Sequence, residues 1–288
     1  MRGGGALVQR AVEILRQEGH NVMAAPTTGP GMAGAMAREH VAGGADLIVV
    51  MGGDGTINEA AEGLIGTPVP LAILPAGTAS VLATEMRLGV NPETVARRLN
   101  GLVPRRISVG HLTCSGGAVS RHFLLMAGVG LDAHVVYKVS GALKAKTGKF
   151  AYWVAGWSLL GKRLAEFEVE IAGEKRKCSF ALLSKVRNYG GDFEIARNVT
   201  LLHDRFEVIL CEGGTAARYV KYFVGMAFNR LSGMRGVTVL HADRVTIAAA
   251  DGRTAYVQID GELGGTLPAE IRIVPDALTL LAPEGYGS

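Results

Sequence analysis

Glycine and acidic residues are concentrated in a short stretch that directly follows an apolar run. The apolar residues 46–51 lead into GGDGTINE at 52–59. Glycine permits positive φ, and without a side chain it lets a ligand approach the main chain closely. Amide groups at such a strand-to-helix turn, together with the helix dipole, favour phosphate. The stretch therefore predicts a phosphate-binding loop.

The acidic residues of this loop indicate chemistry beyond phosphate binding. Asp54 would repel a phosphate unless it engages a Mg²⁺ ion or accepts a proton from an attacking hydroxyl. Glu59 has a second interpretation, because Thr56 and Glu59 have the spacing of a capping box at a helix start. Asp54 is therefore a candidate catalytic residue, and the role of Glu59 stays open between function and helix capping.

A second loop repeats this geometry. The apolar stretch 69–74 is followed by PAGTAS at 75–80. An apolar run of strand length is typical of a strand buried on both faces. We expect this loop to form a second wall of the same site, where Thr78 offers its hydroxyl to a phosphate oxygen or to the nucleotide.

Acidic residues in the second half complete an inventory for phosphoryl transfer. Asp204 precedes an apolar stretch, and Asp260 and Glu262 belong to QIDGE at 258–262. Phosphoryl transfer needs positioning, charge neutralisation by a metal, and a carboxylate that receives the hydroxyl proton. The simpler alternatives are a turn at Asp204 and a hairpin at the Asp-Gly pair, which favours a type I′ turn. Both alternatives stay open at this point.

The elements that must position the two loops alternate between helices and strands. Asn91 and Pro92 have the pattern of a helix N-cap and first helical residue. This alternation predicts a parallel α/β sheet through about residue 105, whose ligands bind at the carboxyl ends of the strands. The expected helices are 6–18, 32–41, 56–64 and one that ends near 86, and the expected strands are 21–25, 46–51 and 69–74.

Strand-like stretches dominate from residue 106 onward. They predict a β-rich domain at 106–275 beside the nucleotide-binding domain at 1–105, with the active site in the cleft between them. We expect residues 276–288 to form a tail that returns to the first domain. The expected strands are 107–113, 122–127, 167–171, 177–184, 206–210, 237–240, 244–250, 255–259 and 270–274, and the expected helices are near 134–140, 148–163 and 214–231.

The composition narrows the class of protein. Of 288 residues, 48% are hydrophobic and 19% charged, which is typical of a globular chain. A net charge of +4 with dispersed basic residues is too small for a nucleic-acid-binding surface, so no nucleic-acid partner is expected. The three cysteines form no CxxC, the histidines show no zinc spacing, and no apolar run is long enough to span a bilayer. These features predict a cytoplasmic protein without disulfides.

The segment 144–163 holds both tryptophans, Trp153 and Trp157, between lysine clusters. Aromatic residues flanked by cations suit a helix at a membrane interface. A helix packed on the sheet of the second domain is the alternative. Peripheral contact with the inner face of a membrane is therefore one of two interpretations of this segment.

The motifs GGDGTxNE, PxGT and DGE, in this order, resemble the diacylglycerol kinase catalytic-domain family. That family includes bacterial lipid kinases and the sphingosine kinases and is distantly related to NAD kinases. TTGPG at 27–31 looks like its threonine loop, and AGVGLDAHVV at 127–136 resembles the segment that opens its second domain. NYGG at 188–191 with LLHDRFEVIL at 201–210 resembles its metal segment. The likeness covers nearly the whole chain.

The resemblance implies a two-domain α/β fold of NAD-kinase/diacylglycerol-kinase type, with a Rossmann-like N-terminal domain and a β-sandwich C-terminal domain. It implies transfer of the ATP γ-phosphate to a lipid hydroxyl, diacylglycerol-like or sphingoid. Glu262 would accept the proton, with Asp260 beside it. Asp204 would bind a structural Mg²⁺ together with the main-chain carbonyls of Leu201 and Phe206. The residues that would hold ATP are Thr28, Gly52, Gly53, Asp54, Gly55, Thr56, Ile57, Asn58, Gly77 and Thr78.

The sequence departs from the family pattern in places. The family opens with a strand and an NPxSG-like loop, whereas the sequence given starts at the following helix, so we expect either a start upstream or an impaired ATP site. Ser80 stands where the family has asparagine, and Arg205 follows Asp204 where glycine is usual. The alternatives are a soluble-substrate kinase of NAD-kinase type and a degenerate nucleotide-binding protein. Neither the acceptor lipid nor the oligomeric state has a signature in the sequence.

Overall fold

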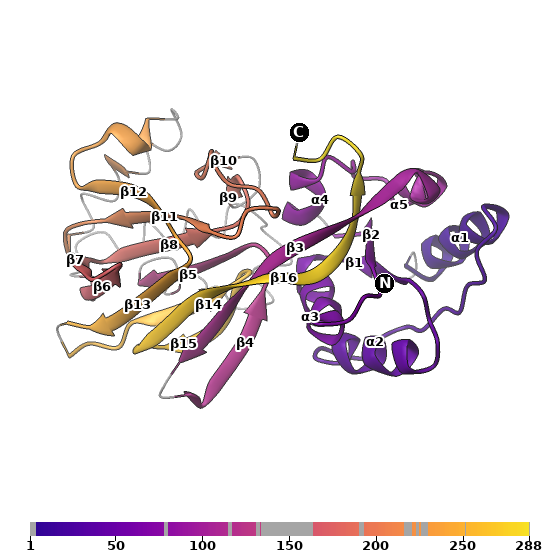
Figure 1. Ribbon diagram of the computed structural model, residues 1–288, viewed down its shortest axis with the longest axis horizontal. Coiled ribbons are helices and arrows are strands. Elements are labelled where there is room, and N and C mark those ends of the chain that lie inside the picture. The colour runs from indigo at the N-terminus through magenta and orange to yellow at the C-terminus, as the bar shows by residue number, and fades with distance from the viewer. Residues whose placement is uncertain are drawn as a thin grey trace. The chain divides into compact units, whose positions relative to one another are not determined.

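The computed structural model describes residues 4–77, 80–114, 117–130, 133, 164–189, 193–215, 221–222, 225, 230–250 and 252–287. The chain forms two compact units, one of residues 1–107 with 276–288 and one of residues 108–275. The first unit is mixed α/β, and the second consists mostly of strands (Figure 1). The chain therefore has the predicted α/β fold with a β-sandwich-like second half.

The first unit contains helices around a short parallel sheet. Its helices are α1 (Gly4–Gln17), α2 (Ala33–Ala42), α3 (Asp54–Leu64), α4 (Val81–Glu85), α5 (Pro92–Arg97) and the 3₁₀ turn η1 (Leu99–Gly101). Its strands are β1 (Ile48–Gly52), β2 (Leu71–Pro75) and the end of β16 (Ala269–Pro283).

The parallel sheet of the first unit is confirmed. Strands β1 and β2 pair in parallel along their whole length, and β16 pairs in parallel with β2 at Leu280 and Leu71. A parallel pair needs a crossover connection, which α3 supplies between β1 and β2. Every residue of β2 is buried, as its unbroken apolar sequence predicts.

The local sequence explains where one helix begins and why one predicted strand does not form. Asn91 accepts hydrogen bonds from the amides of Glu93 and Thr94, and Pro92 begins α5, as predicted. The predicted strand 21–25 is wrong, because this segment has no regular structure. Most of its side chains are exposed, so it offers no apolar face for burial in a sheet.

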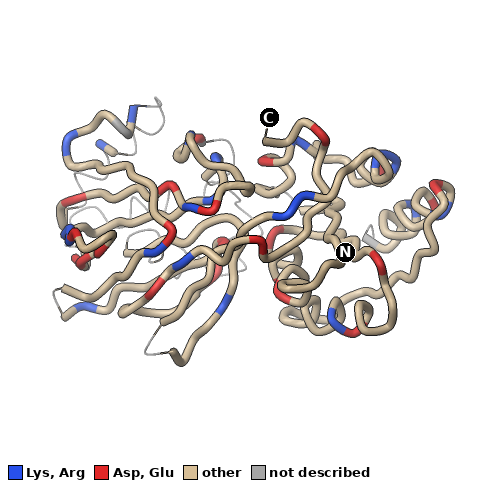
Figure 2. Tube along the Cα trace, viewed as in Figure 1, with Lys and Arg blue, Asp and Glu red and all other residues tan. Residues whose placement is uncertain are grey.

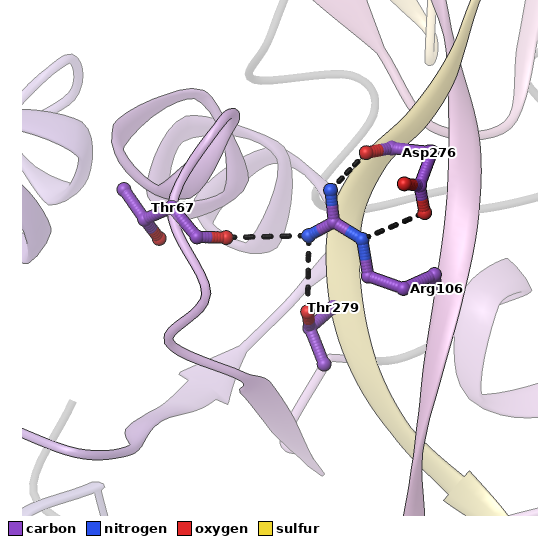
Figure 3. Close-up of polar contacts among 4 residues, drawn as sticks. All are labelled: Thr67, Arg106, Asp276 and Thr279. Atoms are coloured by element: carbon purple, nitrogen blue, oxygen red, sulfur yellow. Dashed lines mark hydrogen bonds and ion pairs between the residues drawn. The ribbon is translucent and has the colours of Figure 1, made fainter.

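The C-terminal residues complete the first unit through Arg106 (Figure 3). Its guanidinium donates to the Asp276 carboxylate at 2.9 Å and to the Asp276 carbonyl. It also donates to the Thr279 hydroxyl at 3.1 Å and to the Thr67 carbonyl at 3.2 Å. The fixed fork of donors on arginine thus joins three stretches of chain that are far apart in sequence.

The second unit is built from strands in two sheets. Its elements are β3 (Leu102–Cys114), β4 (Val119–Phe123), β5 (Met126–Gly130), β6 (Phe167–Ile171), β7 (Glu174–Cys178), β8 (Phe180–Ser184), β9 (Asn188–Tyr189), β10 (Phe193–Glu194), β11 (Phe206–Cys211), η3 (Leu231–Gly233), β12 (Val237–Ala242), β13 (Arg244–Ala249), β14 (Tyr256–Ile259), β15 (Glu262–Thr266) and the first part of β16. Strands β3 and β16 contribute residues to both units.

The two sheets of the second unit share one core. One sheet has the order β12-β11-β8-β5-β14-β15, and the other joins β16, β13, β6 and β7, with β3 paired to β4 and β16. Phe123 from β4 and Phe206 from β11 stack with their ring centroids 5.8 Å apart in a core that both sheets line. This is the packing of a β-sandwich.

Several predicted strands of the second unit have wrong bounds. The expected strand 122–127 is the end of β4 and the start of β5, because residues 124–125 bend to meet the carboxylate of Asp260. The expected strand 177–184 divides into β7 and β8. Strand β15 was not expected, since its sequence ELGGT is rich in glycine, which is depleted in strands.

Other predictions fall on residues that the structure does not describe. These are the helices at 134–140 and 148–163, the tryptophan segment 144–163, and most of the helix 214–231. Among the helices within the described ranges, none is long and apolar enough to cross a membrane. Figure 2 shows Lys and Arg interspersed with Asp and Glu in both units, so the charge of the described chain is mixed rather than of one sign.

Candidate functional site

The two loops predicted to hold phosphate begin side by side at the carboxyl edge of the first unit. Gly52, the last residue of β1, is the register partner of Pro75, the last residue of β2. The Ala76 amide donates to the Gly52 carbonyl at 3.1 Å. A Cβ added to Gly77 would lie 3.1 Å from the Gly53 Cα, so the main chains of the two loops almost touch.

The glycines of the first loop do not have positive φ, and Gly52 is closely packed. Gly53 has φ −95°, Gly52 ends a strand and Gly55 lies in α3, so these residues have extended or helical conformations. A Cβ at Gly52 would lie 3.1 Å from the Cβ of Thr56, which leaves little room for a side chain. The positive φ that glycine permits is therefore not used at this loop, and a Cβ at Gly53 would lie at ordinary contact distance, 4.0 Å, from the Gly77 Cα.

Asp54 connects the two loops. Its carboxylate accepts hydrogen bonds from the Ser80 hydroxyl at 3.0 Å and from the amides of Val81 at 2.9 Å and Leu82 at 3.4 Å. The Ser80 hydroxyl in turn accepts from the Ala83 amide at 3.2 Å and caps α4. The first amides of α4 are thus occupied by protein groups, and the side chain of Asp54 holds the second loop against the first.

The start of α3 differs from that of α4 in its capping. The helix begins at Asp54 with Gly53 as its N-cap, and no side chain within the described part of the chain caps it. Its first helical hydrogen bond runs from the Ile57 amide to the Gly53 carbonyl at 3.1 Å. The amides before Ile57, in the first turn of α3, therefore have no acceptor within the helix. Such a helix N-terminus is the usual place for phosphate.

The predicted capping box at Thr56 and Glu59 is wrong, because α3 begins two residues earlier than expected. Glu59 instead accepts hydrogen bonds from the amides of Gly31 at 2.8 Å and Ala33 at 3.3 Å. These amides lie at the end of the threonine loop and the start of α2. Glu59 thus fixes the loop that carries Thr28.

The other predicted nucleotide residues lie around this edge or outside the described chain. Thr28 is exposed, and its hydroxyl lies 3.1 Å from the Met32 sulfur. Ile57 is fully buried in α3, so it contributes packing rather than a ligand contact. Asn58 is half-buried in the same helix. Thr78 lies outside the described residues.

The DGE motif of the second unit is a two-residue hairpin between β14 and β15. Ile259 and Glu262 are register partners, and Asp260 and Gly261 have φ of 49° and 80°. Two successive residues of positive φ are typical of a type I′ turn, for which Asp-Gly is a favoured pair. The hairpin interpretation of this motif is therefore confirmed, and it leaves open a further role for the acidic side chains.

The side chain of Asp260 is held by main-chain amides. Its carboxylate accepts from Leu124 at 2.8 Å and from Leu125 and Met126 at 2.9 Å each. These amides belong to the bend between β4 and β5. A carboxylate with three amide donors is well stabilised in its charged form, so Asp260 anchors the hairpin to the neighbouring strands.

Glu262 is the accessible acid of the motif. Its carboxylate lies 3.1 Å from the guanidinium of Arg121 on β4, and its side chain is 49% exposed. Sequence reasoning missed Arg121, because Arg121 and Glu262 are 141 residues apart in the chain. A half-exposed carboxylate beside a cation can receive a proton from a substrate hydroxyl.

One oxygen expected to bind a structural metal, the Leu201 carbonyl, faces a lysine instead, whereas Phe206 begins β11. The ammonium of the fully buried Lys185 donates to the carbonyl of Leu201 at 3.2 Å, to the carbonyl of His203 and to the hydroxyl of Ser108. Asp204 is exposed, and no group of three or more His, Cys, Asp or Glu side chains within the described residues could hold a metal. Because the Leu201 carbonyl already accepts from a protein cation and Asp204 is exposed, these residues do not fit a divalent metal ion.

The buried cation influences its surroundings electrostatically. Burial lowers the pKa of the Lys185 ammonium to about 8, and the nearby carboxylate of Asp204 opposes this shift. The pKa of His203 is also lowered, first by burial and then by the cations around it, which include Arg205 and Lys185. Sequence reasoning missed Lys185, which directly follows the strand predicted at 177–184.

Comparison with known proteins agrees with this architecture. Residues 2–112 match the diacylglycerol kinase catalytic domain, and residues 126–282 match the YegS C-terminal NAD kinase beta sandwich-like domain. The chain is 26% identical over 270 residues to a diacylglycerol kinase of Bacillus subtilis, and this alignment covers 91% of this chain and 86% of that protein. It is 27% identical over 248 residues to a diacylglycerol kinase of Mycobacterium tuberculosis, and this alignment covers 84% of this chain and 79% of that protein.

A solved structure shares the fold. The crystal structure of a diacylglycerol kinase from Bacillus anthracis superposes with a TM-score of 0.78 at 20% identity and covers 97% of this chain and 92% of that one. The α/β unit with its two glycine loops and the sandwich unit thus define a phosphotransferase of kinase type. The chain belongs to the diacylglycerol kinase catalytic-domain family.

Proposed function

We propose that this chain is an ATP-dependent lipid kinase that transfers the γ-phosphate to a lipid hydroxyl, diacylglycerol-like or sphingoid. The observation that carries the proposal is the meeting of two loops at the carboxyl edge of β1 and β2, beside the uncapped start of α3. Amides of a helix N-terminus bind phosphate, and absent side chains let it approach closely. Relatives named diacylglycerol kinase support the choice of a lipid acceptor.

The first unit supplies the nucleotide-binding residues. The main chain from Gly52 to Thr56 is proposed to contact the phosphates, and Thr28 and Thr78 to offer hydroxyls to the nucleotide. Asp54 is proposed to act by keeping the second loop in place through Ser80 and the start of α4. A Mg²⁺ ion that accompanies ATP as part of the substrate would neutralise the charge of the transferred group.

The second unit supplies the acid that handles the proton. Glu262 is proposed to accept the proton of the lipid hydroxyl as the oxygen attacks the γ-phosphorus of ATP. Asp260 is proposed to act through position, since its carboxylate is committed to three amides and holds the turn that carries Glu262. Catalysis in this scheme is positioning and charge stabilisation, as phosphoryl transfer requires.

A transfer assay with competing acceptors tests the proposal. The purified chain is incubated with γ-labelled ATP and Mg²⁺ together with vesicles containing diacylglycerol, vesicles containing sphingosine, or NAD. We expect label in one of the lipids and none in NAD. Label in NADP alone would replace the lipid kinase by a soluble-substrate kinase, and ATP binding without transfer to any acceptor would indicate a degenerate nucleotide-binding protein.

A further inference from the structure

A fully buried lysine lies where the family resemblance places a metal. Lys185 follows β8, and its side chain has no exposed surface. Its ammonium donates to the carbonyl oxygens of Leu201 and His203, which lie in the turn before β11. Its third contact is the hydroxyl of Ser108 in β3. The three donors of an ammonium thus meet three oxygen acceptors.

The contacts also connect to one another. The Ser108 hydroxyl donates to the same His203 carbonyl at 2.8 Å, so the oxygens form a closed cluster around the cation. The amide of Lys185 donates to the Leu125 carbonyl at 2.8 Å, which fixes the main chain beneath the side chain. A buried charge is tolerated only when its hydrogen bonds are satisfied, and these contacts meet that requirement.

We propose that the ammonium of Lys185 replaces a structural divalent cation in this chain. It joins β3, the end of β8 and the turn at 201–203 through three oxygen atoms, one of which is an expected metal ligand. The carbonyl of Leu201, expected as a metal ligand, is a hydrogen-bond acceptor of the lysine. The second unit therefore needs no bound Mg²⁺ at this place to keep the turn before β11 in position.

The chemistry of the surrounding residues agrees with this replacement. Asp204 is the one carboxylate of the turn 201–205, and it is exposed. The nearby Glu207 is buried but accepts the Asn198 amide at 2.7 Å. Main-chain carbonyls and a hydroxyl suffice for a singly charged ammonium, whereas Mg²⁺ usually requires carboxylates as well as water.

This inference does not depend on the proposed function, because its test measures metal content and stability and not phosphate transfer. The full chain is passed through gel filtration without added metal, and its Mg²⁺ content is measured. Thermal unfolding is then followed with excess EDTA and with excess Mg²⁺. We expect far less than one Mg²⁺ per chain and the same melting temperature in both solutions.

Two variants measure the contribution of the ammonium. Lys185→Met keeps the length of the side chain but removes the buried charge and its hydrogen bonds to the carbonyls of Leu201 and His203. We expect its melting temperature to fall by at least about 6 °C. The control Lys177→Met removes an exposed lysine that pairs with Glu166, and we expect a shift of less than about 2 °C.

Three outcomes would overturn the inference. The first is one Mg²⁺ retained per wild-type chain, and the second is a wild-type melting temperature that falls in EDTA and returns with Mg²⁺. The third is a Lys185→Met variant with the same melting temperature as the wild-type chain. If Lys185→Met yields no folded protein, the two measurements on the wild-type chain still decide the question.

Discussion

Two glycine-rich turns carry acids in this molecule, and they use them differently. In the first unit, the carboxylate of Asp54 ties one loop to another and leaves the amides of α3 as the open feature. In the DGE hairpin, the carboxylate of Asp260 ties the turn to its neighbours and leaves Glu262 as the open feature. In both turns an aspartate provides structure, and in the hairpin the neighbouring Glu262 is half-exposed beside Arg121.

The aspartates of the two turns have structural roles. Asp54 and Asp260 both accept hydrogen bonds from several amides, which is a structural use of a carboxylate. A motif that contains an acid therefore does not by itself identify the reacting group. The exposed fraction and the partners of each carboxylate separate a positioning acid from one that can meet a substrate.

The largest effect is expected when the half-exposed acid of the hairpin, Glu262, is replaced. Glu262→Gln keeps the shape of the side chain but cannot accept a proton, so transfer should fall by about 10²–10⁴-fold. Initial rates with labelled ATP and the lipid identified as acceptor measure this loss. The control is Glu270→Gln, a partly exposed acid on β16 that also pairs with an arginine and should keep the wild-type rate. A wild-type rate in Glu262→Gln would remove this residue from the mechanism.

A smaller loss is expected from the aspartate of the first unit. Asp54→Asn replaces a carboxylate oxygen by an amide group that cannot accept from the amides at the start of α4. The second loop should shift, and a misplacement of about 1 Å lowers transfer by about 10²-fold. Steady-state kinetics measure the change, and Asp46→Asn, an exposed acid ahead of β1, is the control. An unchanged rate with an unchanged KM for ATP would contradict the positioning role.

The anchor of the hairpin should affect stability before it affects chemistry. Asp260→Ala leaves three amides without their acceptor and places alanine at φ 49°, so the free energy of unfolding should fall by about 3 kcal/mol. Asp260→Asn should be milder, because asparagine tolerates positive φ and keeps one acceptor oxygen. Urea unfolding of both variants measures the difference. If Asp260→Ala unfolds at the wild-type urea concentration, the anchor assignment is wrong.

The sequence predicts features that depend on neighbouring residues. The buried strand β2, the cap at Asn91 and the parallel order of β1 and β2 all follow from local pattern and short connections. The two glycine loops could also be expected at one edge, since carboxyl ends of parallel strands meet there.

Features that join distant parts of the chain could not be predicted in the same way. The contact of Asp54 with Ser80 spans 26 residues, and that of Lys185 with Ser108 spans 77. Nothing in the local sequence says that Glu59 reaches the amide of Gly31 rather than capping its own helix. These contacts depend on which elements pack together, and this decides whether an acid positions a loop or reacts.

The most direct test of the account is ATP binding to the glycine loop. Gly53→Ala adds a methyl group that would lie 4.0 Å from the Gly77 Cα, at a φ of −95° that alanine adopts readily, so the fold should be unchanged. The same methyl group should obstruct a phosphate at the start of α3. Calorimetric titration with ATP and Mg²⁺ should show saturable binding to the wild-type chain and at least about tenfold weaker binding to Gly53→Ala, at equal melting temperatures. Equal affinity in the two proteins, or no binding to the wild-type chain, would contradict the central claim.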